Sequence, residues 1–164
     1  MATISMATAG AAGLHPSRNA NVKVPYLVEV EIDFAEATTE KGSALAQADV
    51  IEALPIPANT MLLAGGACVK SAMTGTSTDL TLDIGVTGGD VDNLVDGFAY
   101  DGVAAGVYAT VVGVNEPVFF ASADTIDILI ATQTNTFTGG VLRVFALLVD
   151  VSDAVAPGIA AVGS

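Results

Sequence analysis

The sequence contains one cysteine, one histidine and no tryptophan among its 164 residues. The lone Cys68 excludes an intramolecular disulfide and any multi-cysteine metal site, and its small apolar neighbours favour an inert, packed thiol. The lone His15 excludes histidine-rich metal centres. Catalysis by a serine–histidine or cysteine–histidine arrangement would depend on this one residue near the terminus. We therefore expect no catalytic residues, no cofactor and no enzyme activity.

Basic residues are also scarce. Five lysines and arginines stand against eighteen acidic residues, giving a net charge of −13. Such a charge repels phosphate backbones and anionic lipid surfaces, so we expect neither a nucleic-acid nor a membrane partner. No uncharged apolar run reaches the roughly 18 residues needed to span a bilayer. Residues 1–14 lack lysine, arginine and a leucine-rich run, so we expect no secretory signal and a location in the cytoplasm of the producing cell.

Apolar residues are abundant by comparison. They make up 52% of the chain, only 14% of residues are charged, and the mean hydropathy is +0.63. A small soluble monomer normally covers more of its surface with charge. The composition therefore predicts that some apolar surface is buried against other chains, and we expect a homo-oligomer.

Alternation of apolar and polar residues is the dominant pattern. Residues 28–34 place Val, Val, Ile and Phe on one face and three carboxylates on the other, and residues 80–86 and 126–130 repeat the pattern. Segments that are apolar on both faces predict central or covered strands. These segments are 61–73, 107–114, 116–121 and 141–151.

One segment is ambiguous. In residues 43–54 alanine and leucine favour a helix, whereas Val50, Ile51 and the nearby prolines favour a strand, which we predict. About eight short strands and no long helix predict an all-β protein. We expect an antiparallel, jelly-roll-like β-sandwich over residues 23–153.

The two ends of the chain lack this periodicity. Residues 1–22 are small and polar and predict an extended N-terminal arm, either a disordered tail or a segment that becomes ordered on a neighbour. Residues 154–164 form a shorter C-terminal tail. Arg18 lies in the arm and Lys23 directly follows it, so two of the five basic residues lie there.

Clusters of acidic residues are the nearest approach to a metal site. Asp90, Asp92 and Asp96 lie in a glycine-led loop, but Leu94 and Val95 break the spacing of a calcium-binding EF-hand loop. A solvated loop is favoured, and we expect no metal. Glu29, Glu31 and Asp33 have no histidine or apolar pocket to separate their pKa values, and they predict a solvated sheet face.

Aromatic residues make up only 5% of the chain. Phe119, Phe120 and Tyr100 are candidates for a carbohydrate-binding platform. Without tryptophan, and at this low aromatic content, core packing is favoured for all three.

The order of these motifs resembles a known family. Residues 48–60 read ADVIEALPIPANT and precede the apolar segment 61–73, after which 80–86 reads LTLDIGV, with Gly89-Asp90 and then LVDG at 94–97. Over about residues 27–150 this pattern resembles head decoration (cement) proteins of tailed bacteriophages. Asn59 stands where such relatives often carry glycine, and both residues suit the same turn.

The resemblance implies a trimeric β-sandwich on the outer surface of the virion, bound to neighbouring major capsid subunits and without catalytic residues. In that setting Arg18 and Lys23 become candidate contacts to an acidic capsid surface. A receptor-binding or adhesive β-sandwich module of a head fibre or tail is the alternative, and a jelly-roll hydrolase or lyase is a more distant one.

Overall fold

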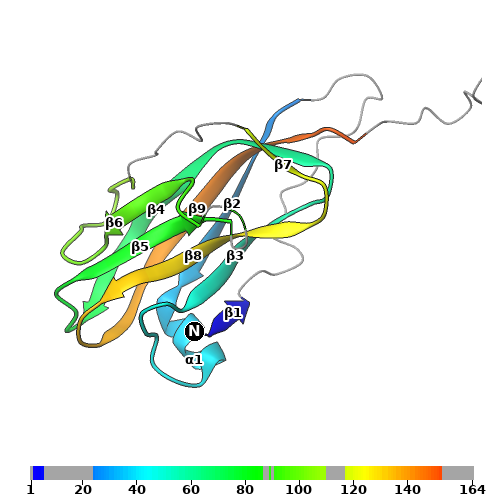
Figure 1. Ribbon diagram of the computed structural model, residues 1–164. Coiled ribbons are helices and arrows are strands. Elements are labelled where there is room, and N and C mark those ends of the chain that lie inside the picture. The colour runs from blue at the N-terminus through cyan, green and yellow to red at the C-terminus, as the bar shows by residue number, and fades with distance from the viewer. Residues whose placement is uncertain (1, 6–23, 87–88, 90, 110–116, 153–164) are drawn as a thin grey trace, which may run out of the picture.

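Two β-sheets stack as the layers of a sandwich (Figure 1). The computed structural model describes residues 2–5, 24–86, 89, 91–109 and 117–152. One sheet has the strand order β2-β9-β4-β7 and the other β1-β3-β8-β5-β6. The elements are β1 (Thr3–Ser5), β2 (Tyr26–Asp33), α1 (Phe34–Lys41), β3 (Val50–Ile56), β4 (Thr60–Gly75), β5 (Leu80–Gly85), β6 (Val95–Ala99), β7 (Val118–Phe120), β8 (Asp124–Gln133) and β9 (Phe137–Asp150).

The strand pairing confirms the predicted jelly roll. Strand β2 pairs antiparallel with β9, β3 with β8, β4 with β7 and β5 with β6, so the chain forms a set of nested hairpins. Pairing of β4 with β9 and of β5 with β8 folds this set into two four-stranded layers. Eight strands connected in this way form a jelly roll. Strand β1 is added at one edge.

Alternating side chains fill the space between the layers. Ile126, Ile128 and Ile130 of β8 are all fully buried, as are Leu142 and Val144 of β9. Because successive residues of a strand point to opposite faces, the residues between them lie on the outward sides of the two sheets. The sequence pattern identified this core correctly.

The short helix α1 was not predicted. The alternation of β2 ends at Asp33, whose carboxylate Oδ1 accepts a 2.8 Å hydrogen bond from the backbone N–H of Ala35 and so caps the helix. Gly42 ends it with φ +73°, and its N–H donates to the carbonyls of Thr38 and Thr39. Phe34 is the first residue of α1 and is fully buried, so the apolar alternation of β2 continues one residue past the end of the strand.

The predicted strand over residues 43–54 is wrong for 43–49. Strand β3 begins at Val50. Ala48 has φ +68°, a left-handed conformation that interrupts an extended chain. The loop is fixed to the end of β8 because the side-chain amide of Gln47 donates to the carbonyl of Ala131 and that of Gln133 donates to the carbonyl of Leu45.

Three other segments differ from the prediction. Strand β6 was missed because Asp96-Gly97 has the composition of a turn. Of the predicted strand 107–114, Tyr108 makes one isolated antiparallel bridge to Cys68 of β4, and residues 110–116 lie outside the described residues. The predicted strand 116–121 corresponds to the shorter β7.

Strand β1 lies within the segment that was expected to be an arm. It pairs in parallel with β3, in a register that matches Ile4 with Ile51, and Ile4 is 5% exposed. The start of the segment is therefore part of the sandwich. Figure 1 shows β1 and α1 together at one end of the two layers. No helix in the described part of the chain is long and apolar enough to cross a membrane.

Candidate functional site

The outward side of the β2-β9-β4-β7 sheet is the first candidate site, and we call it the outer face. Pairing places Leu27 beside Leu147, Glu29 beside Phe145, and Glu31 beside Arg143. Strand β4 continues these rows with Ala64, Gly66 and Cys68. The residues that define the outer face are Leu27, Glu29, Glu31, Asp33, Met61, Ala64, Lys70, Tyr108, Phe119, Arg143, Phe145, Leu147 and Val149.

One half of the outer face is apolar. Leu27 is 60% exposed, and Leu147 directly opposite it is half-buried. Met61 pairs with Val149 on one side and with Phe119 on the other, and Phe119 is 53% exposed. These exposed apolar side chains form a patch over all four strands. A patch of this kind is typical of a protein–protein contact.

The other half carries charges of both signs. Lys70 Nζ lies 3.5 Å from Glu31 Oε1, and Arg143 Nη1 lies 3.6 Å from Glu29 Oε2. Arg143 Nη2 also donates to the hydroxyl of Tyr108 at 3.4 Å. Exposed ion pairs of this type contribute little to stability, so their main effect here is to offset the charges of Glu29 and Glu31. Asp33, exposed on the same side of β2, leaves this half with one net negative charge.

Tyr108 lies between the two halves. Its side chain is 58% exposed, and its ring stands edge-on to that of Phe145 with 6.3 Å between centroids. The backbone bridge from Tyr108 to Cys68 holds this segment on β4, and Cys68 is only 4% exposed. The buried position of Cys68 agrees with the inert thiol that the sequence predicts.

The outward side of the β1-β3-β8-β5-β6 sheet is different in charge. Its five strands contain no lysine or arginine. Alternation places Glu52 of β3, Asp83 of β5 and the 4% exposed Asp127 of β8 on that side, and Glu52 pairs directly with Asp127 in register. This side of the sandwich is therefore acidic with no offsetting basic residue on its strands, whereas two of the three carboxylates on the outer face are paired with basic residues.

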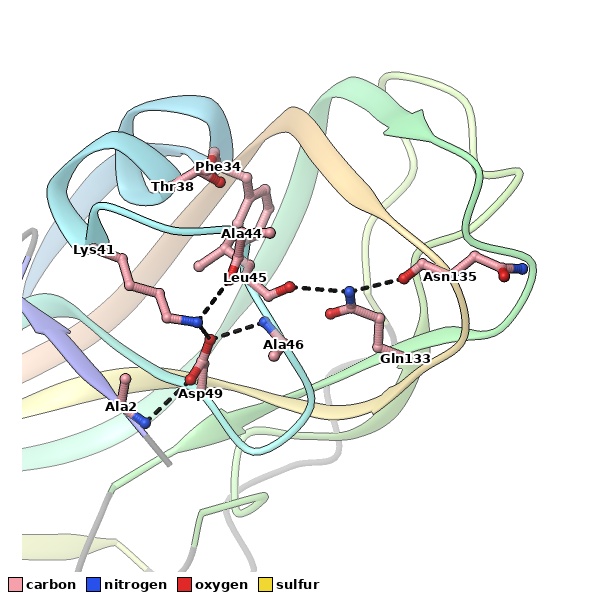
Figure 2. Close-up of polar contacts among 10 residues, drawn as sticks. All are labelled: Ala2, Phe34, Thr38, Lys41, Ala44, Leu45, Ala46, Asp49, Gln133 and Asn135. Carbon is pink, nitrogen blue, oxygen red and sulfur yellow. Dashed lines mark hydrogen bonds and ion pairs between the residues drawn. The ribbon is translucent and has the colours of Figure 1, made fainter.

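A second candidate site is the clasp, formed by Ala2, Lys41, Ala46 and Asp49 (Figure 2). The Asp49 carboxylate is nearly buried. It accepts hydrogen bonds from the backbone N–H of Ala2 at 3.1 Å, from that of Ala46 at 2.8 Å, and from Lys41 Nζ. The Val50 N–H donates to the Ala2 carbonyl at 2.9 Å. The clasp thus joins β1, the end of α1 and the start of β3.

Charge keeps Asp49 ionised in this position. Burial alone would raise the pKa of the Asp49 carboxyl, but the hydrogen bonds from Lys41, Ala46 and Ala2, with the positive charge of Lys41, together hold this pKa below its ordinary value. The carboxylate therefore has a structural role in holding β1. No sequence motif indicated it, because the four residues come from three separate segments.

The structure places the other sequence candidates as follows. Arg18, Lys23, His15 and Asp90 lie outside the described residues. Within the described part of the chain, no three His, Cys, Asp or Glu side chains are grouped as metal ligands.

The aromatic candidates divide between core and surface. Tyr100 is fully buried and Phe120 is 5% exposed, as favoured, whereas Phe119 faces outward on β7. The three rings do not form a platform. Sequence reasoning missed the pairing of Tyr108 with Phe145, because a contact between residues so far apart depends on the sheet register.

Comparison with known proteins shows that this chain is similar to solved structures in its fold. No family model matches the sequence, and no curated protein matches it. A chain in the capsid of Ralstonia phage GP4 has a similar structure, with a TM-score of 0.60, 20% identity, and coverage of 90% of this chain and 99% of that one. A chain in the cyanophage Pam1 capsid asymmetric unit has a TM-score of 0.51, 15% identity, and coverage of 84% and 93%. The chains share a fold.

Proposed function

We propose that this chain is a head decoration, or cement, protein of a tailed bacteriophage. In this role it binds the outer surface of the head as a homotrimer and stabilises contacts between neighbouring major capsid subunits. The proposal includes no catalytic step and no cofactor, and the protein passes from the host cytoplasm to the virion on assembly.

One observation carries the proposal. The likeness to the Ralstonia phage GP4 capsid chain covers 99% of that chain, so it extends over a whole capsid component and not over one domain of a larger protein. The resemblance in the sequence over about residues 27–150 points to the same class of protein. A net charge of −13 also favours a position outside the shell, away from packaged DNA.

Binding to heads that lack this protein tests the proposal directly. We expect the purified protein to sediment with such heads, to saturate at a fixed ratio to the major capsid protein, and to raise the temperature at which the heads break open. Binding to host cells in place of heads would indicate a receptor-binding module. Binding to neither would contradict the proposal.

We further propose that Arg18 and Lys23 contact an acidic patch of the capsid. They are the basic residues of the N-terminal segment in an otherwise acidic chain. Replacing both with serine should weaken sedimentation with heads, and more so at low salt, where charges are less screened.

A control must change the net charge equally. Ala104 and Ala105 are exposed in the loop after β6, and replacing both with glutamate also makes the chain more negative by two charges. This control should bind heads as the unchanged protein does. Equal loss of binding in both variants would show that total charge, and not the basic segment, determines attachment.

A further inference from the structure

The outer face is apolar at one end and carries two ion pairs at the other, and we propose that it packs against a second copy of this chain. The inference rests on the oligomer in the proposed function and names the surface that forms it. Three arguments support a second copy as the occupant: the location of exposed apolar side chains, the charge of each sheet, and the pairing of the charges.

Exposed apolar side chains are concentrated on one sheet. In the described part of the chain, five large apolar side chains are more than 40% exposed, and all lie on or next to the β2-β9-β4-β7 sheet: Val24 (52%), Leu27 (60%), Val107 (42%), Tyr108 (58%) and Phe119 (53%). Val24 precedes β2, and Val107 is held to β4 by the hydrogen bond from the Val69 N–H to its carbonyl. The other sheet exposes none of them. Covering this side of the sandwich therefore removes the largest apolar surface from water.

The charge on the outward side of each sheet indicates which side can pack against another copy of the chain. A copy of the same chain also carries −13, so an acidic side meeting it would repel. The side with Glu52 and Asp83 has no basic residue on its strands, whereas Glu29 and Glu31 on the outer face are matched by Arg143 and Lys70. Asp33 leaves the outer face with one net negative charge, so two such acidic chains repel less there than at the side without basic residues.

The position of the ion pairs is consistent with this occupant. Glu31 and Lys70 are both about half exposed, and each keeps polar atoms free to bond across a contact. The charged half borders the apolar half along β9, where Arg143, Phe145 and Leu147 follow at alternate positions. An apolar centre with a polar border is the usual composition of a subunit interface.

The test compares matched leucines on the two outward sides. Leu147 in the central strand β9 and Leu129 in the central strand β8 are both half-buried and point outward from opposite sheets. We expect the unchanged chain to be an oligomer by light scattering after gel filtration. Leu147→Gln should raise the dissociation constant at least about 10-fold, while Leu129→Gln should leave it unchanged.

A second variant keeps the test independent of folding. Leu27 is 60% exposed, so Leu27→Gln should preserve the thermal unfolding transition of the isolated subunit and still weaken the oligomer. An unchanged chain that is monomeric at micromolar concentration would overturn the inference. So would a Leu27→Gln variant as oligomeric as the unchanged protein, or equal dissociation by Leu129→Gln.

Sedimentation with heads separates this inference from the proposed function. If the variants are monomeric and the unchanged protein binds heads, both proposals are supported. If the variants remain oligomeric but no longer bind heads, the outer face contacts the capsid, and the second-copy inference is overturned. If the unchanged protein is an oligomer that dissociates on Leu27→Gln but never binds heads, the inference stands and the proposed function is wrong.

Discussion

Gly140 and Tyr100 show how single residues determine the packing at the core. The Tyr100 side chain is fully buried, and its hydroxyl donates to the carbonyl of Ser71 at 2.7 Å. Burial, with the negative charge of Asp33 as the second cause, raises the pKa of Tyr100 to about 12, so the hydroxyl stays protonated and remains a donor. Gly140 has φ +130°, and a Cβ at that position would collide with the Tyr100 hydroxyl.

We predict that Gly140→Ala lowers the free energy of unfolding by about 2–4 kcal/mol, through backbone strain and the collision together. Urea denaturation measures the loss. Gly97→Ala is the control, because Gly97 also has positive φ (+61°) but nothing lies within 4 Å of a Cβ there. It should cost about 1 kcal/mol. Equal losses would show that the contact with Tyr100 contributes nothing.

Asp49 gives the structure a dependence on pH. Its pKa is lowered in the folded chain, so its contribution to stability is complete above the unfolded pKa of about 3.9 and is lost as the pH falls through the lower folded value. We predict that Asp49→Asn destabilises the protein by about 1–3 kcal/mol at pH 7, since Lys41 loses its partner.

The sign can be checked by repeating the urea titration at low pH. The difference between the unchanged chain and Asp49→Asn should shrink at about pH 3, where the carboxylate becomes protonated. A difference that is equal at both pH values would mean that the charge of Asp49 does not hold the clasp.

Strand β1 is the element that depends most on a few contacts. It has three residues, pairs only with β3, and places only Ile4 in the core. We predict that Ile4→Asp detaches β1 without unfolding the sandwich, because the eight strands of the jelly roll remain paired. The amide of Val50, which donates to the Ala2 carbonyl, should then exchange its hydrogen at least about 10-fold faster.

Thr3→Asp is the matched control, since Thr3 is exposed and points away from the core. It adds the same charge to the same strand and should leave exchange at Val50 nearly unchanged. Global unfolding of Ile4→Asp would show that β1 is essential to the whole fold and not a separable strand.

Local pattern predicts strands well and their ends poorly. The buried isoleucines of β8 and the alternation of β2 follow from a period of two, which the sequence displays directly. Helix α1 depends on Asp33 and Gly42 as caps, and these residues are as common in turns as at helix ends. Strand β1 has only Ile4 as an apolar residue, too short a signal to separate from an unstructured arm.

The candidate sites depend on contacts between distant segments. The acidic residues of β2 were predicted to face solvent, which is correct, but their partners Lys70 and Arg143 could not be identified without the register of β2, β9 and β4. The clasp is a similar case, since Ala2 and Asp49 meet only after β1 pairs with β3. Composition predicts that apolar surface is buried against other chains, which stays a prediction, and it does not indicate which surface that is.

At the scale of the whole molecule, charge is distributed unequally between the outward sides of the two sheets. Both described basic residues on its strands lie on the outer face, and the opposite side is acidic. We have proposed that the outer face, where basic residues offset most of the acidic charge, meets other copies of the chain. A trimer built in this way would present its acidic sides away from the subunit contacts and would rely on Arg18 and Lys23 for an attractive contact with an acidic capsid.

Electron cryomicroscopy of phage heads, with and without this protein, tests the central claim most directly. The difference map should show additional density on the outer surface of the shell, with threefold symmetry and a shape that fits three copies of the two-layered sandwich. Density on the inner surface of the shell, or no difference at all under conditions where the protein is folded, would contradict the claim that this chain is a head decoration protein.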